Sequence, residues 1–226
     1  LDYHKNFKEY FKAKQYLFEN LIRKKGNVIT DETIPEFKRI RKIAISRKLR
    51  LQALNNNKNQ FQILSHSFRG ETQILKIKYN NLSREINLNL IGKIQLKNIL
   101  MAIIAAKNSN LSLIKILNVL SKLKPIDGRF EKIGKIENKS KVILDYAHTP
   151  DALRICLSNL KEQFPNKKMI LLFGCGGNRD QKKRFKMGRI ASNYSNEIYL
   201  TDDNPRFEDP RKIRDDIKKG IQNTLI

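Results

Sequence analysis

The stretch Met169-Ile170-Leu171-Leu172-Phe173-Gly174-Cys175-Gly176-Gly177 joins a run of apolar residues to a glycine-rich segment. A continuous apolar run of this length is typical of a parallel β-strand that is covered on both faces. Glycines directly after such a strand let the backbone turn and approach a ligand closely. The stretch therefore predicts a strand of an α/β sheet with a ligand-binding loop at its carboxyl end.

Further strands and helices are expected on both sides of this stretch. Short apolar runs at residues 142–144 and 198–200 predict two more strands. A helix is expected after each of the three strands: over residues 150–164, from about residue 183, and from about residue 210. Strands that alternate with helices in this way predict a Rossmann-like α/β fold with a mostly parallel sheet.

An acidic segment, Thr201-Asp202-Asp203-Asn204-Pro205-Arg206-Phe207-Glu208-Asp209-Pro210, lies between the last strand and the last helix. Its acids can hold an ammonium group, and Arg206 offers a planar fork that binds a carboxylate through two parallel hydrogen bonds. This combination suits a small zwitterion. The simpler alternative is a strand-to-helix turn, with Asp209 as the N-cap and Pro210 at the first helical position.

Polar segments follow all three predicted strands: residues 145–148, 174–177 and 203–206. Ligands of parallel sheets collect at the carboxyl ends of the strands, so we expect these segments to share one edge. A carboxylate at a strand end, such as Asp145, commonly accepts hydrogen bonds from a ribose diol. His148 is either a base or a loop residue that forms hydrogen bonds.

The segment Lys124-Pro125-Ile126-Asp127-Gly128-Arg129 is punctuated by proline and glycine and predicts a domain boundary. We therefore expect one domain over residues 1–124 and a second over residues 125–226. In the first, alternating apolar and polar residues predict a half-buried antiparallel sheet. The strands are expected at residues 43–45, 61–64, 74–77 and 86–90, followed by a buried helix at residues 97–107 and a second helix at residues 112–123.

Residues 6–20 predict an amphipathic helix with Lys14 on its apolar stripe. The stripe is formed by Phe7, Tyr10, Phe11, Leu17, Phe18 and Leu21. Burial would disfavour the charged form of Lys14 and make its amine nucleophilic. Alternatively, the stem of Lys14 lies on the core while its head reaches water. The pattern leaves both interpretations open.

Composition limits the class of protein. The chain has 226 residues, of which 40% are hydrophobic and 30% charged, as in ordinary globular proteins. Two cysteines are too few for a disulfide framework, and no apolar run approaches the roughly 20 residues that span a bilayer. The formal net charge of +24 favours polyanionic partners, but lysines scattered among many isoleucines and asparagines also fit the bias of an AT-rich genome.

Together these motifs resemble the Mur ligases, the ATP-dependent amino-acid ligases of peptidoglycan synthesis. The glycine-rich segment and the Asp-Asn-Pro-Arg segment together are specific for this family. The arginine at the last position of the second segment resembles the form found in members that add diaminopimelate. The matching segments stand in the family's order over nearly the whole chain: residues 1–4, 10–14, 127–131, 145–153, 173–180 with 183–184, and 203–206.

The resemblance implies roles for individual residues. Lys14 matches the family's carbamylated lysine, whose carbamate helps to hold Mg²⁺ near the γ-phosphate of ATP. Arg129 and Asp145 match residues that contact ATP, and Asn98 matches an asparagine beside the adenine. The residues that match the meso-diaminopimelate site are Arg179, Asp203, Asn204, Pro205 and Arg206.

The resemblance also implies the chemistry. ATP phosphorylates the γ-carboxylate of D-glutamate in a UDP-MurNAc-dipeptide, and the amine of meso-diaminopimelate attacks the resulting acyl phosphate. Mg²⁺ and cationic side chains stabilise the transferring phosphoryl group. We expect a cytoplasmic bacterial enzyme of cell-wall biogenesis, cell shape and cell division, acting as a monomer on small molecules, without membrane insertion or a specific nucleic acid.

The chain departs from the family in length. Members are about twice as long, and the chain lacks a Gly-x-x-Gly-Lys-[Ser/Thr] phosphate loop, a uridine-nucleotide domain and a Gly-Lys-Gly-His-Glu motif. We therefore expect an internal fragment that is inactive alone: the later part of the central ATP-binding domain over residues 1–124, and most of the C-terminal Rossmann-like amino-acid-binding domain over residues 125–226.

Two alternatives stay open. The first is a related ligase, either a lysine-adding Mur ligase or a folylpolyglutamate synthase, although Arg206 and the glycine-rich segment argue against both. The second is a basic nucleic-acid-binding protein, suggested by the charge of +24. No RNA-binding aromatic signature or zinc-ligand spacing supports it.

Overall fold

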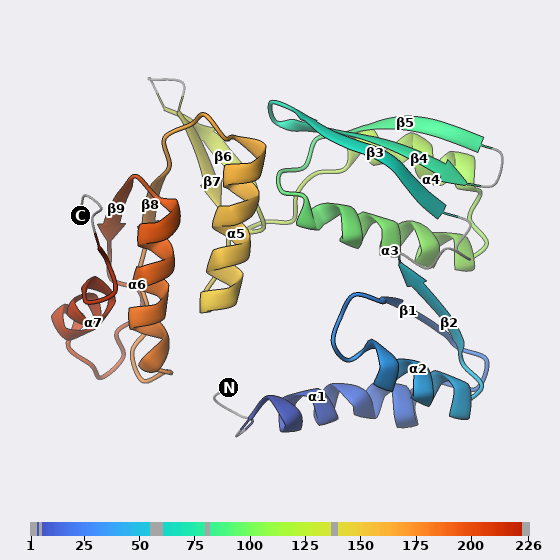
Figure 1. The fold of residues 1–226 in the computed structure, drawn as a ribbon, viewed down its shortest axis with the longest axis horizontal. Helices are drawn as coiled ribbons and strands as arrows, with labels where there is room; N and C mark the ends of the chain where they lie inside the picture. Colours follow the sequence, from blue (N-terminus) through green and yellow to red (C-terminus); the bar gives the residue numbers. More distant parts are fainter. Residues whose placement is uncertain (1–3, 5, 55–60, 80–81, 137–139, 223–226) are drawn as a thin grey trace. The chain divides into compact units, whose positions relative to one another are not determined.

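The structure is a computed structural model that describes residues 4, 6–54, 61–79, 82–136 and 140–222 (Figure 1). The chain divides into two compact units, the first ending at Lys124 and the second beginning at Pro125. Among the described residues, no helix is both long and apolar enough to cross a bilayer.

The first helix, α1 (Phe7–Tyr16), continues into a π-helical turn, η1 (Leu17–Leu21), so the predicted helix is confirmed. Asn6 caps it by accepting a hydrogen bond from the backbone N–H of Glu9. Three residues of its apolar stripe, Phe7, Leu17 and Leu21, are exposed and the other three are partly buried, and Gln15 is the buried residue of α1. Lys14 is also exposed, with its Nζ 5.2 Å from the centroid of the Tyr10 ring, so the interpretation of a buried Lys14 is wrong.

A βαβ unit follows the first helix. Strands β1 (Asn27–Asp31) and β2 (Arg50–Leu54) pair in parallel, and α2 (Phe37–Ser46) connects them. The predicted strand at residues 43–45 is wrong because those residues lie within α2. Ile40, Ile43 and Ala44 form the buried face of that helix at the helical spacing i, i+3, i+4. This spacing cannot be recognised within the three residues 43–45 alone.

The predicted antiparallel sheet is confirmed as β3 (Phe61–Arg69), β4 (Thr72–Tyr79) and β5 (Leu82–Leu88), with β4 in the centre. The helices α3 (Ile94–Asn108) and α4 (Leu113–Val119), followed by η2 (Leu120–Lys122), cover one face. The core between the sheet and these helices includes Leu75, Ile77, Ile86, Leu88, Leu96, Ile99 and Ile103.

The end of β1 is held to α3 by an ion pair between the buried Asp31 and the partly exposed Lys97. Asp31, whose side chain is 9% exposed, accepts hydrogen bonds from Lys97 and from the hydroxyl and backbone N–H of Thr33. Burial alone would raise the pKa of Asp31, but the hydrogen bonds from Lys97 and Thr33 outweigh it and hold the pKa below its ordinary value of 3.8.

Asp31→Asn should therefore destabilise the first unit in a pH-dependent way. A carboxyl group whose pKa falls on folding stabilises the folded state above its unfolded pKa, and this stability is lost as pH falls through the folded pKa. The difference in free energy of unfolding between wild type and Asp31→Asn should be constant near neutral pH and shrink below about pH 4. Denaturant unfolding from pH 7 to 2 tests this, with Glu32→Gln as the matched control; a difference independent of pH would contradict it.

The second unit contains the two strands that position the candidate site. Strand β8 (Ile170–Phe173) leads into α6 (Lys182–Tyr194), and β9 (Glu197–Leu200) pairs with β8 in parallel and leads into α7 (Pro210–Lys218). The side chain of Asp209 caps α7 and Pro210 begins it, as predicted. The core of this unit contains Leu153, Leu157, Cys175, Met187, Ile213 and Ile217.

The second unit differs from the sequence-based expectation in two respects. Strand β7 (Lys141–Leu144), which precedes helix α5 (Pro150–Gln163), pairs antiparallel with β6 (Glu131–Lys135). In β8, Leu171 packs on the core whereas Ile170 and Leu172 are 57% and 67% exposed, so β8 is covered on one face in the part of the chain that is described. The α/β fold class itself is confirmed, with parallel pairing in β8–β9 and in β1–β2.

Candidate functional site

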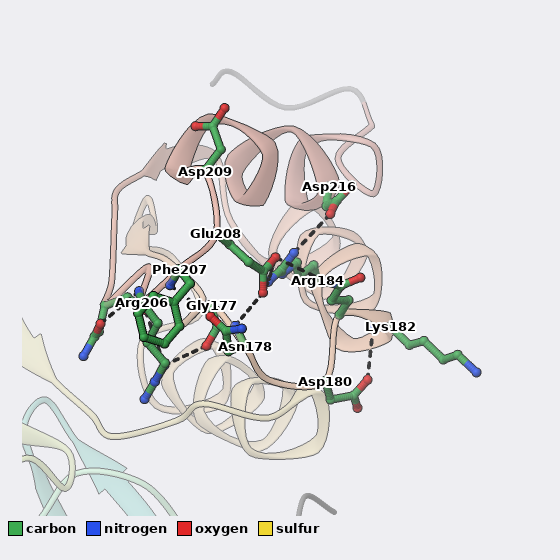
Figure 2. Close-up of polar contacts among 12 residues, drawn as sticks. Gly177, Asn178, Asp180, Lys182, Arg184, Arg206, Phe207, Glu208, Asp209 and Asp216 are labelled. Atoms are coloured by element: carbon green, nitrogen blue, oxygen red, sulfur yellow. Dashed lines mark hydrogen bonds and ion pairs between the residues drawn. The ribbon is translucent and has the colours of Figure 1, made fainter.

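Two loops follow the carboxyl ends of β8 and β9 and pack against each other (Figure 2). We call residues 174–181 the glycine-rich loop and residues 201–209 the acidic loop. The backbone N–H of Thr201 donates to the carbonyl of Phe173 at 3.0 Å, which extends the strand pairing into the loops. The N–H of Gly177 donates to the carbonyl of Asn204 at 2.9 Å. The predicted shared edge is therefore present for these two segments.

The glycines of the first loop are required by the close approach of the second. A Cβ atom on Gly177 would lie 1.9 Å from the carbonyl oxygen of Pro205, and one on Gly174 would lie 2.3 Å from that of Thr201. Neither separation is possible for real atoms. The absence of side chains at these positions thus lets the two backbones touch.

Arg206 lies at the tip of the acidic loop. Its φ angle of +52° is in the left-handed region, which a residue with a Cβ rarely adopts. Its guanidinium Nη1 donates to the carbonyl of Gly177 at 2.8 Å, and its backbone N–H donates to Oδ1 of Asn204 at 3.1 Å. Asp203 and Asn204 are exposed next to it, and Arg179 is exposed on the facing loop. The structure therefore brings the predicted diaminopimelate residues onto two contacting loops.

A buried arginine lies behind these loops. The side chain of Arg184, in α6, is 0% exposed and forms ion pairs with Glu208 at 2.8 Å and with Asp216 at 3.2 Å. Glu208 also accepts the backbone N–H of Asn178, and this hydrogen bond, together with Arg184, holds the pKa of Glu208 below its usual range. In return, Oδ1 of Asn178 accepts the backbone N–H of Phe207 at 3.0 Å.

The sequence-based analysis did not assign functions to Arg184 and Glu208. A signal for Arg184 was present, because it shares an i, i+3, i+4, i+7 stripe with the buried residues Met187, Gly188 and Ala191. A charged residue on such a stripe needs a buried partner. No comparable signal distinguishes Glu208 from the other acids around it.

The residues predicted to contact ATP in the second unit lie together. Asp145 accepts the backbone N–H groups of Phe130 and Ala147, both at 3.0 Å, and thereby joins the turn after Gly128 to the end of β7. The guanidinium of Arg129 lies over the ring of Tyr146, 4.8 Å from its centroid. Arg129 and Asp145 therefore lie on two segments that contact each other.

Asp145→Ala should destabilise the second unit by about 1–3 kcal/mol, because two backbone N–H groups lose a charged acceptor. Asp151→Ala is the matched control: its side chain is 90% exposed, and its 3.7 Å ion pair with Arg154 should contribute little. Urea unfolding of the two variants measures the difference. Equal midpoints would show that Asp145 does not hold the turn.

The other two predicted site residues lie in the first unit. Asn98 is exposed on α3, and its Nδ2 donates to Oε1 of Gln95 at 3.3 Å. Lys14 is exposed on α1. Within the described ranges, no group of three or more His, Cys, Asp or Glu side chains could hold a metal ion.

Comparison with known proteins gives matches to two family models. The model of the Mur ligase middle domain matches residues 1–106, and that of the Mur ligase glutamate ligase domain matches residues 128–226. Among curated proteins, the UDP-N-acetylmuramoyl-L-alanyl-D-glutamate–2,6-diaminopimelate ligase of Rickettsia bellii is 35% identical over 226 residues, covering 99% of this chain and 46% of the relative. That of Leptospira interrogans is 35% identical over 231 residues, covering 100% and 45%.

Solved structures give the same result. A structure of a UDP-N-acetylmuramoyl-L-alanyl-D-glutamate–2,6-diaminopimelate ligase is 30% identical with a TM-score of 0.61, covering 97% of this chain and 45% of that one. A Mycobacterium tuberculosis folylpolyglutamate synthase, at 14% identity and a TM-score of 0.77, covers 100% and 51% and shares the fold. The chain thus spans about half the length of the relatives it matches.

Proposed function

Because this chain belongs to the Mur ligase family, we propose that it carries parts of an ATP-dependent ligase that adds meso-diaminopimelate to UDP-N-acetylmuramoyl-L-alanyl-D-glutamate. Residues 1–124 supply the later part of the ATP-binding domain, and residues 125–226 supply most of the amino-acid-binding domain. The enzyme acts in the cytoplasm as a monomer, on small-molecule substrates.

The paired loops are the observation that carries this proposal. Arg206 and Arg179 present cationic groups on contacting loops, and Asp203 lies beside Arg206. Guanidinium groups bind carboxylates, and carboxylates bind ammonium groups. Diaminopimelate carries an ammonium and a carboxylate group at each end. The loops can therefore hold one end while the amine of the other end reacts.

The nucleotide site is proposed on the arrangement around Asp145. Arg129, held over Tyr146, offers a cationic plane to an aromatic base or a phosphate. Asp145 holds the turn that carries Arg129 through its hydrogen bond from the backbone N–H of Phe130. Asn98 is proposed to lie beside the adenine, as its match in the family implies. ATP supplies the phosphoryl group that activates the γ-carboxylate of the acceptor.

Mg²⁺ is proposed as the second cofactor, held in part by a carbamate on Lys14. Lys14 is exposed, so carbon dioxide can reach its amine. The Mg²⁺ proposal rests on the match of Lys14 to the family's lysine. When bound, Mg²⁺ would neutralise charge on the transferring phosphoryl group.

The test is an assay of the complete gene product. It should release ADP when given ATP, Mg²⁺, UDP-N-acetylmuramoyl-L-alanyl-D-glutamate and meso-diaminopimelate together. Replacing meso-diaminopimelate by L-lysine should abolish most of the release. Turnover with lysine in place of diaminopimelate would assign a lysine-adding ligase instead, and no release with either amino acid would overturn the proposal.

A further inference from the structure

The acidic loop is held in place by polar contacts. Phe207, its one aromatic residue, is 96% exposed and so contributes no packing to the core. The neighbouring residue, Arg206, has a φ angle of +52°. Left-handed backbone is unfavourable at a residue with a side chain, and it persists when surrounding contacts hold it. Hydrogen bonds between the acidic loop and the glycine-rich loop therefore help to hold the conformation of Arg206.

Those hydrogen bonds form a closed circuit with Glu208 (Figure 2). Glu208 accepts the backbone N–H of Asn178 and the side-chain amide of Gln181, the latter at 3.3 Å. The side-chain Oδ1 of Asn178 accepts a hydrogen bond from the backbone N–H of Phe207. The acidic loop is thus held on both sides of Arg206: two residues before it, where Asn204 accepts the N–H of Gly177, and directly after it, where Phe207 donates to Asn178.

The circuit is anchored in the core by Arg184. Two of its nitrogens bind carboxylates, Nη2 to Glu208 and Nη1 to Asp216, while its buried Nε has no hydrogen-bond partner among the residues that the structure describes. A buried ion pair is a weak source of stability, because desolvation offsets most of the attraction between the charges. It does fix geometry, since a guanidinium binds a carboxylate in one plane.

We propose that Glu208, anchored by Arg184, is a positioning residue for the amino-acid substrate and holds Arg206 in its binding conformation. The inference rests on the proposed function for the identity of the substrate. The two carboxylates that pair with Arg184 lie in different elements and make different further contacts. Glu208 belongs to the acidic loop and to the circuit, whereas Asp216 lies in α7 and binds Arg184 and Lys219.

This difference supplies a matched pair of variants in the complete gene product. Glu208→Ala removes both the Arg184 ion pair and the acceptor for Asn178. Asp216→Ala removes an ion pair of the same arginine and leaves the circuit intact. We expect hydrogen–deuterium exchange over residues 174–181 and 201–209 to be about 10-fold faster in Glu208→Ala and unchanged in Asp216→Ala.

The kinetic readout links the loops to the substrate. The KM for meso-diaminopimelate should rise about 10-fold in Glu208→Ala and stay within about 2-fold of wild type in Asp216→Ala, with the KM for ATP unchanged in both. Glu208→Gln should recover part of the affinity, because its amide oxygen can still accept from Asn178 and Arg184. A general loss of folding would instead lower the apparent kcat, through a smaller fraction of active enzyme, and leave both KM values unchanged.

Failure of this inference differs from failure of the proposed function. If wild type uses diaminopimelate but Glu208→Ala and Asp216→Ala change its KM equally, the positioning role is overturned and the activity stands. If wild type does not use diaminopimelate, the proposed function is overturned. In that case, equal exchange rates in the two alanine variants would also overturn the positioning role, and faster exchange confined to Glu208→Ala would support it.

Discussion

Arg206→Ala in the complete gene product should lower kcat/KM for meso-diaminopimelate by about 100-fold and leave the KM for ATP near its wild-type value. A charge-assisted, two-pronged contact to a substrate carboxylate is worth about 3 kcal/mol, which corresponds to this factor. The truncation also removes the hydrogen bond from Nη1 to the carbonyl of Gly177, so the tip of the acidic loop loses one of its ties.

Two control variants isolate the guanidinium. Arg206→Lys keeps the charge but loses the planar fork, so it should recover less than half of the lost free energy. Arg211→Ala removes an exposed arginine from the first turn of α7, outside both loops, and should leave kcat/KM unchanged. Steady-state kinetics with diaminopimelate and ATP varied separately measure all three. An Arg206→Ala enzyme with unaltered use of diaminopimelate would remove the basis of the substrate assignment.

Among glycine-to-alanine substitutions in the second unit, Gly177→Ala should disturb the backbone most. Its Cβ would lie 1.9 Å from the carbonyl oxygen of Pro205, so one of the two loop backbones must move. Overpacking of this kind costs about 1–3 kcal/mol, and the movement also breaks the hydrogen bond from Gly177 to Asn204. We therefore expect lower stability together with a raised KM for diaminopimelate.

Gly134→Ala provides the comparison for Gly177→Ala. A Cβ on Gly134, in β6 of the same unit, would meet no atom within 4 Å. Its free energy of unfolding should stay within about 0.5 kcal/mol of wild type. Urea unfolding and a diaminopimelate titration of the two variants test the difference. Similar stability for both would show that the loops are not in contact in solution.

Regular patterns made the secondary structure predictable. The short apolar run at residues 74–77 indicated a strand and the alternation along residues 86–90 a half-buried sheet, and the structure confirms the strands as β4 and β5. Residues 43–45 misled because three apolar residues fit a strand and a helix face equally well. Residues 37–46 as a whole, with Ile40, Ile43 and Ala44 on one side, indicate the helix.

The candidate site was predictable in part. The glycine-rich and acidic loops could be placed at strand ends, because parallel strands share one carboxyl edge. The dependence of Arg206 on Glu208 could not be predicted, since it passes through backbone groups of Asn178 and Phe207, and sequence patterns do not specify such groups. The exposure of Lys14 could not be predicted either, because an apolar stripe in the sequence does not show which element packs against it.

The mutual fit of the two loops limits how substrate choice can be re-engineered. Each loop supplies backbone donors or acceptors that the other requires, and Gly177 and Pro205 leave no room for independent change. Grafting an acidic loop from a relative with another amino-acid preference should therefore fail when transplanted by itself. A successful chimera would exchange both loops together with Arg184, so that amino-acid preference is inherited as a single module.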